Sequence, residues 1–252
     1  MPFRVLRVVL FYLALLGLWQ VVAMLHVWPK YVLPPPNEVW DSFWTYLRSG
    51  RITDAVEISM RRLLIGYFIG LVAGVLIGMA MANWKWVDET LGSAVLGLQS
   101  LPSVTWVPLA VIWFGINDKA IIFVVVMGSV ASIAISARSG MQQMPPIYKR
   151  AALTMGASRL QTARYVQLPA LLPSMTQGLK LGWSFAWRSL MAAELIVATV
   201  SLGQLLDLGR SLNDMSLVLA VMLVIVAIGL FVDFLVFGRI ERFVQERWGL
   251  AT

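Results

Sequence analysis

Residues 145–169 read PPIYKRAALTMGASRLQTARYVQLP and form the longest basic interruption in an otherwise apolar chain. Two prolines open the stretch, and the residues that follow them favour a helix. Gly156 interrupts that helix, and Ser158 is suited to cap the one that resumes. Pro169 and Pro173 are expected to close the segment. The pattern predicts a helix, a tight turn and a second helix that lie outside the hydrocarbon of a membrane.

The composition indicates an all-α integral membrane protein. Hydrophobic residues make up 59% of the 252 positions and charged residues only 13%, whereas about a quarter of the residues in a soluble domain are charged. The net charge of +7 comes from basic residues dispersed among apolar segments. They are typical of topology signals and contacts with lipid headgroups rather than of a nucleic-acid surface.

Few residues are available for catalysis or metal binding. The chain has no cysteine, which excludes disulfides, thiolate nucleophiles and cysteine metal sites. Its single histidine, His26, follows an apolar run and is expected at the membrane interface rather than as a ligand. We therefore expect no catalytic residue and no metal site.

Six segments are long and apolar enough to cross a bilayer, which takes about 20 residues of helix. A single transmembrane domain covering residues 1–252 is therefore expected, with a connecting loop at about 139–173 between the fourth and fifth spans. Pro102 and Pro108 predict a kink or break in the third span. The expected spans are residues 5–27, 63–82, 90–114, 120–137, 174–200 and 217–237.

Six spans place both termini on one side of the membrane. Lysine and arginine are more frequent on the side that carries the termini and the 139–173 loop. Because positive residues favour the cytoplasmic side, cytoplasmic termini and a cytoplasmic loop are expected. Arg61 and Arg62, just before the second span, are assigned to the outer side.

The second span carries a glycine at every fourth position, namely Gly66, Gly70, Gly74 and Gly78. This spacing puts all four on one face of a helix and forms a smooth groove. Such a groove lets the backbone of another helix approach closely. The glycines are expected to serve helix packing, within one subunit or between subunits.

The fifth span is the polar one, with Lys180, Ser184, Arg188 and Glu194 in an otherwise apolar run. Ionisable groups inside a membrane are costly and face a cavity or one another, so these four are candidates to line a translocation pathway. Arg188, near mid-span, presents planar donors suited to an oxyanion. The alternative is a buried structural pair of Arg188 or Glu194 with another helix, for instance through Asp233, and both readings stay open.

The 145–169 stretch also has the spacing of a known motif: Ala-Ala, three residues, Gly, nine residues, Val, one residue, Leu-Pro. It resembles the cytoplasmic coupling motif of permease subunits in bacterial ABC importers, except that Arg150 stands where the motif has Glu. The stretch LPSVTWVPLAVIWFG at 101–115 resembles the nitrate, sulfonate, taurine and bicarbonate branch of these permeases. The coupling loop implied by the resemblance comprises Arg150, Ala151, Ala152, Met155, Gly156, Ala157, Ser158, Leu168 and Pro169.

The resemblance implies a type I ABC importer permease fold and a homodimer in the bacterial inner membrane. It also implies two cytoplasmic ATPase subunits that bind ATP and Mg, and an external substrate-binding protein. No Gly-Lys dipeptide occurs in the chain, so it lacks a phosphate-binding loop, and ATP must be hydrolysed by another polypeptide. The implied substrate is a small anion such as a sulfonate, taurine, nitrate or bicarbonate.

Three alternatives remain. Similar permeases carry thiamine or riboflavin precursors. An ion-coupled secondary transporter would be expected to show internal repeats and membrane carboxylates, for which only Glu194 and Asp233 qualify. An intramembrane enzyme would need a set of catalytic side chains, and one histidine with no cysteine leaves few candidates for it. The last two leave the motif spacing unexplained.

Overall fold

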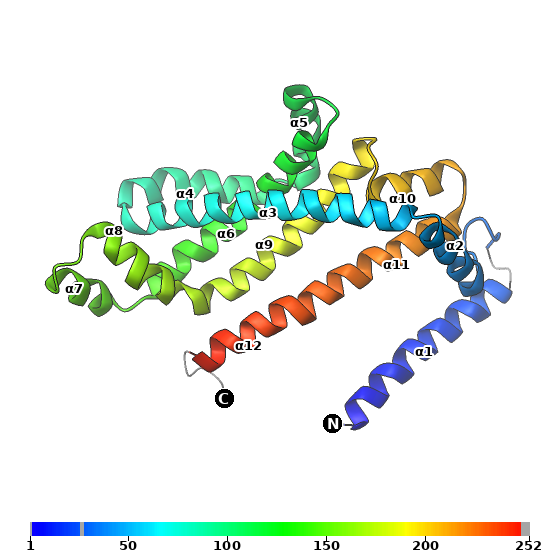
Figure 1. Ribbon diagram of the computed structural model, residues 1–252, viewed down its shortest axis with the longest axis horizontal. Coiled ribbons are helices and arrows are strands. Elements are labelled where there is room, and N and C mark those ends of the chain that lie inside the picture. The colour runs from blue at the N-terminus through cyan, green and yellow to red at the C-terminus, as the bar shows by residue number, and fades with distance from the viewer. Residues whose placement is uncertain (1, 26–27, 248–252) are drawn as a thin grey trace. The chain divides into compact units, whose positions relative to one another are not determined.

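The computed structural model describes residues 2–25 and 28–247, and every secondary-structure element in that part of the chain is helical (Figure 1). The helices belong to two compact units. One consists of the residues up to Ile58 together with Val200–Ala227, and the other of Ser59–Thr199 and the chain from Ile228 onward. His26 and the expected end of the first span lie outside the described residues.

The first unit contains helices from both ends of the sequence. Trp19 Nε1 in its first helix donates to the Pro34 carbonyl at 3.1 Å, just before the second helix. Ser201 caps a later helix by accepting from the Gln204 N–H at 3.0 Å. The elements are α1 (Pro2–Met24), α2 (Pro36–Arg48), the beginning of α3 (Arg51–Asn83), α10 (Leu202–Ser211) and most of α11 (Met215–Phe231).

The second unit is built around α6 (Asp118–Gln143), which packs extensively against α9 (Leu168–Ile196). Its largest buried cluster joins these helices to Leu63 of α3 and Val107 of α5. The remaining elements are α4 (Lys85–Ser100), η1 (Ser103–Thr105), α5 (Trp106–Phe114), α7 (Pro146–Thr154), α8 (Arg159–Thr162), η2 (Ala163–Gln167), η3 (Val232–Phe237) and α12 (Gly238–Arg247).

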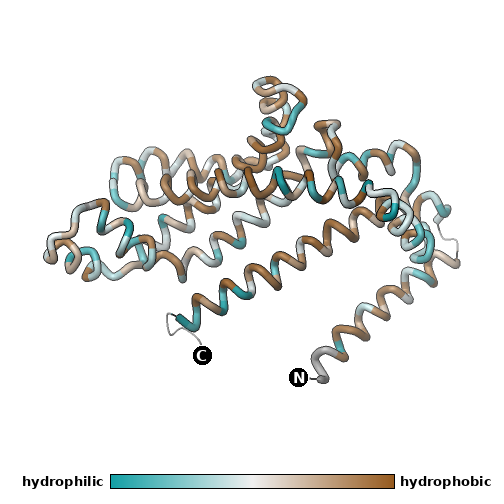
Figure 2. The backbone as a smooth tube through the Cα atoms, viewed as in Figure 1, coloured by the Kyte–Doolittle hydropathy of each residue, from teal (hydrophilic) through white to brown (hydrophobic). Residues whose placement is uncertain are grey.

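In the described part of the chain, four helical segments are long and apolar enough to cross a membrane: Leu6–Met24, Arg51–Asn83, Asp118–Gln143 and Met215–Arg247. A fifth is obtained if α4 and the helix after it count as one broken span. The fifth expected span, at 174–200, corresponds to α9, which has 29 residues but is too polar to pass the same test. Figure 2 shows hydrophobic residues predominating along α1 and α11, with hydrophilic ones more frequent in α9.

Proline has different effects at the expected positions. The third span breaks at Leu101 and Pro102, where the two helical parts meet at 96°. Pro108, by contrast, lies in the first turn of α5 and breaks nothing, because a proline there removes no intrahelical hydrogen bond. The expectation that Pro169 and Pro173 close the basic segment is wrong. Both lie inside α9, and α8, η2 and α9 follow one another without a gap from residue 159 to 196.

The four glycines of α3 face α6. A methyl group added at Gly74 would lie 2.8 Å from Ile133 Cβ, and one at Gly66 would lie 2.7 Å from Val125 Cγ1. From the other side, a methyl group on Gly182 of α9 would lie 2.6 Å from Ile133 Cγ1. Ile133 is thus held between glycines of two helices. The absence of side chains at these positions lets α3, α6 and α9 approach closely.

Candidate functional site

A glycine-dependent turn ends the first helix of the basic segment. Gly156 has φ of +82°, its N–H donates to the Leu153 carbonyl at 3.0 Å, and the Ala157 N–H donates to the Ala152 carbonyl at 3.0 Å. This pair of bonds is a Schellman motif, which satisfies the carbonyls at the end of α7. The left-handed conformation explains why glycine occupies position 156.

The next helix begins with a reciprocal cap. Ser158 Oγ accepts from the Gln161 N–H at 3.2 Å, and the Ser158 N–H donates to Gln161 Oε1 at 2.7 Å. These two bonds form a capping box, so the cap expected at Ser158 is present. With the Gly156 turn, it fixes the direction in which the chain leaves α7 and enters α8.

The basic segment exposes apolar side chains. Ala152 is buried, whereas Met155 is 87% exposed and Ile147 is 64% exposed. The apolar side chains of this segment are therefore divided between the interior and the surface. Most other members of the predicted coupling loop are exposed too, namely Arg150, Ala151, Gly156, Ser158, Leu168 and Pro169, while Ala157 is half-buried. Exposed apolar residues outside the apolar spans indicate a surface for another protein.

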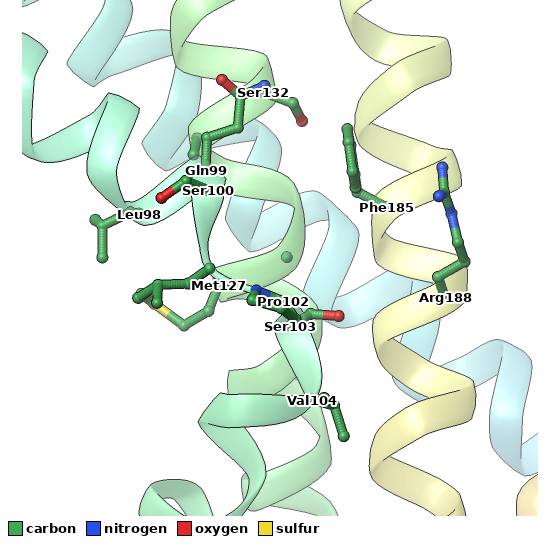
Figure 3. Close-up of a pocket in the computed structure, with 13 residues that line it drawn as sticks. Leu98, Gln99, Ser100, Pro102, Ser103, Val104, Met127, Ser132, Phe185 and Arg188 are labelled. Carbon is green, nitrogen blue, oxygen red and sulfur yellow. The ribbon is translucent and has the colours of Figure 1, made fainter.

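A second feature is a cavity of about 300 Å³ at the break between α4 and η1. Figure 3 shows Phe185 and Arg188 on α9 across from the residues of the break. The polar lining residues are Gln99, Ser100, Ser103, Ser132 and Arg188. The apolar ones include Leu98, Met127 and Phe185. A cation, hydroxyls and apolar side chains thus surround a volume suited to a small organic anion.

Arg188 has no carboxylate partner among the described residues. Its Nε donates to the Ser184 carbonyl at 3.2 Å, and its guanidinium lies 5.0 Å from the centre of the Phe185 ring. The side chain is exposed. The pairings considered for it are taken up elsewhere, since Glu194 and Asp233 both bind other cations. Arg188 is thus an uncompensated positive charge at the cavity.

Glu194 lies in a buried ionic network rather than on the cavity. Arg62 Nη1 donates to Glu194 Oε1 at 3.1 Å, and Ser59 Oγ donates to both carboxylate oxygens at 2.8 and 2.9 Å. Arg62 Nη2 also pairs with Asp118 Oδ1 at 2.6 Å, and Asp118 accepts from Arg61 at 3.1 Å. The network joins α3, α6 and α9 and balances two positive charges with two negative ones.

Lys180 is likewise paired away from the cavity. Its Nζ lies 3.0 Å from Asp233 Oδ1 on η3, and both side chains are partly exposed. Of the four pathway candidates, the structure places Arg188 on the cavity and Ser184 one turn before it, bonded to it. Lys180 and Glu194 are held in ion pairs with other helices.

Sequence reasoning missed several residues. The polar residues at the helix break, including Ser100 and Ser103, are uncharged, so the sequence alone does not mark them as lining a cavity. Arg62 is expected before the start of the second span, but α3 begins at Arg51 and Arg62 lies buried within it. Among the residues that the structure describes, no three histidine, aspartate or glutamate side chains come together as a metal site.

The chain is similar to known transport proteins. The family model described as the binding-protein-dependent transport system inner membrane component matches residues 70–243, more than half of the chain. The taurine transport system permease protein TauC of Escherichia coli is 32% identical over 224 residues, which cover 87% of this chain and 82% of that protein. The putative aliphatic sulfonates transport permease protein SsuC of Escherichia coli is 28% identical over 94% of this chain and 89% of its own length.

A solved structure has the same fold. It shows inward-facing conformations of the MetNI methionine ABC transporter, and the TM-score is 0.66 at 22% sequence identity. The match covers 77% of this chain and 96% of that chain. The all-α architecture is therefore that of a type I importer permease.

Proposed function

The chain belongs to the family of inner membrane components of binding-protein-dependent transport systems, and on this premise we propose that it forms the translocation pathway for a small anion. The substrates we favour are taurine and other sulfonates, in line with the names of its relatives TauC and SsuC. A second copy of the chain completes the pathway. Nitrate and bicarbonate belong to the same class of substrate, and thiamine or riboflavin precursors are the alternative.

Arg188 carries this proposal. An unpaired guanidinium on a membrane-spanning helix is costly against lipid, so it faces either water or a ligand. Arg188 lines the cavity at the helix break, and no carboxylate among the described residues neutralises it. A sulfonate presents three oxygens to such a group, and the serine hydroxyls of the cavity add further donors. The polarity of α9 then follows from its place beside the pathway.

The energy for transport comes from ATPase subunits that dock on the basic segment. Met155 and Ile147 offer exposed apolar side chains outside the spans, and the bonds around Gly156 and Ser158 hold their helices at a fixed angle. ATP and Mg bind to the ATPase subunits and not to this chain. With the basic segment on the ATPase side, both termini lie in the cytoplasm.

Reconstitution tests the proposal. The chain is co-expressed with the ATPase and the binding protein encoded beside it and placed in liposomes. ATP hydrolysis and uptake are then measured with taurine, an alkanesulfonate, nitrate, bicarbonate and a thiamine precursor. We expect one loaded binding protein to stimulate hydrolysis, with a sulfonate as the substrate taken up.

Three variants locate the anion contact. Arg188→Gln should lower uptake at least tenfold, because the loss of one charge-assisted contact costs roughly 1.5–3 kcal/mol. Arg188→Lys keeps the charge and should retain part of the activity. Arg239→Gln removes an exposed arginine in α12, far along the sequence from the cavity, and should leave uptake unchanged. Unaltered uptake by Arg188→Gln in a fully assembled complex would refute the anion contact.

A further inference from the structure

A cavity of about 670 Å³ lies between the end of α3 and the basic segment. One wall consists of Leu76, Met79, Ala80 and Asn83 at the end of α3, together with Trp84, which follows α3. Its wall on the other side comes from α7, α8 and η2, with Lys149, Leu153, Leu160, Thr162, Ala163 and Gln167. The cavity is separate from the one at the helix break, with which it shares no lining residue.

The lining changes from apolar to polar along α3. Of the lining residues on α3, the apolar Leu76, Met79 and Ala80 precede the polar Asn83, which is the last residue of the helix. At 1.5 Å per residue, the apolar wall from Leu76 to Ala80 is about 6 Å deep, and the polar Asn83 lies about 4.5 Å further along the helix axis. Trp84 follows directly and is 54% exposed, as is typical of a tryptophan at the membrane interface. The cavity therefore has an apolar part on the membrane side and a polar rim at the interface.

The rim carries one positive charge and no negative one. Lys149 Nζ donates to Asn83 Oδ1 at 3.1 Å, which leaves two of its three N–H groups for other acceptors. No aspartate or glutamate lines the cavity. The nearest acidic residues in the sequence are already paired, Asp88 with Arg138 and Glu89 with Lys85. In the described part of the chain, Lys149 has no carboxylate partner.

We propose that this cavity binds one anionic phospholipid, with its phosphate at Lys149 and an acyl chain against Leu76, Met79 and Ala80. A neutral lipid would satisfy the apolar wall but leave the ammonium group without an anion. A soluble phosphate ester would satisfy the ammonium but leave the apolar wall exposed. Only an amphiphile with a negative headgroup matches both parts. The proposal requires that the chain spans the membrane and does not depend on what it transports.

Native mass spectrometry of the full-length chain tests the site. The protein is reconstituted into nanodiscs of phosphatidylcholine, with or without phosphatidylglycerol, and the lipids retained after transfer to detergent are counted. We expect one phosphatidylglycerol per chain to be retained in preference to phosphatidylcholine. Lys149→Gln should reduce that retention about fivefold, the value of one lysine near an anionic headgroup. Ala80→Phe, which fills the apolar part of the cavity, should abolish it.

Lys85→Gln is the matched control. Lys85 is the first residue of α4, directly after Trp84, but it lies outside the cavity. Its side chain is 92% exposed and pairs with Glu89. This variant should retain as much phosphatidylglycerol as the unaltered protein. Equal retention of phosphatidylcholine, an equal loss in Lys85→Gln, or no loss in Lys149→Gln would overturn the proposal. Displacement of the lipid by soluble glycerol phosphate, or by the added ATPase subunit, would overturn it as well.

Discussion

The ionic network that joins α3, α6 and α9 makes a quantitative prediction for Arg62→Met. The Arg62 and Glu194 side chains are 4% and 0% exposed, and the Nη1 to Oε1 distance is 3.1 Å. Replacing the guanidinium leaves the buried Glu194 carboxylate without this cation, while the Ser59 hydroxyl still donates a hydrogen bond to it. Removing one partner of a buried ion pair costs about 3–5 kcal/mol. The hydroxyl is retained, so we expect the lower end of that range, about 3 kcal/mol.

Thermal unfolding in detergent measures this loss, and for a chain of this size it corresponds to a melting temperature lower by about 6–12 °C. The double variant Arg62→Met with Glu194→Gln removes both charges and should recover more than half of the loss. Arg61→Met is the control, because Arg61 is 63% exposed and its pair with Asp118 contributes less than about 1 kcal/mol. A double variant as unstable as Arg62→Met alone would refute the reasoning.

Three further predictions concern glycines and the docking surface. Gly74→Ala should destabilise the protein by about 1–3 kcal/mol, because the added methyl group overpacks against Ile133. Gly97→Ala, in an open position of α4, should stabilise the protein by about 0.5–1 kcal/mol. Chemical denaturation measures both changes, and equal effects of the two variants would contradict the packing of α3 on α6. Gly156→Ala should cost about 1–2 kcal/mol through its left-handed backbone and weaken substrate-stimulated ATP hydrolysis. Met155→Asp should leave the melting temperature unchanged but reduce co-purification of the ATPase, and undiminished co-purification would exclude that residue from the docking surface.

Sequence patterns predicted the features that depend on residues close together in the chain. The break at Pro102 follows from the missing N–H of proline. The cap at Ser158 follows from a hydroxyl that accepts a hydrogen bond from the backbone N–H three residues later. Hydropathy predicted the apolar helices because it too depends only on residues close together in the chain. The polar character of α9 also marked it out, although the sequence could not separate Arg188 at a cavity from Glu194 in an ion pair.

The remaining features depend on distant residues. Arg62 pairs with Glu194, 132 positions away, and no local pattern predicts which charge in a polar run will be buried. The first turns of α3 are polar and lie outside the span expected at 63–82, since hydropathy measures transfer into lipid and not helix formation. Pro173 was read as the end of a segment, but it is accommodated inside α9, where tertiary packing outweighs local preference.

The unbroken helical run from α8 through η2 into α9 has a mechanical consequence. Arg159 and Arg188 are 29 residues apart in one run of helical elements without a connecting loop. This run packs closely against α6, because methyl groups added at Gly178 and Gly182 would overlap Ser136 and Ile133. We therefore expect a force applied to α8 to reach Phe185 and Arg188, which line the cavity on α9, without passing through a loop. The wider turn of η2, in which hydrogen bonds reach one residue further than in an α-helix, lies on this route between the basic segment and the cavity.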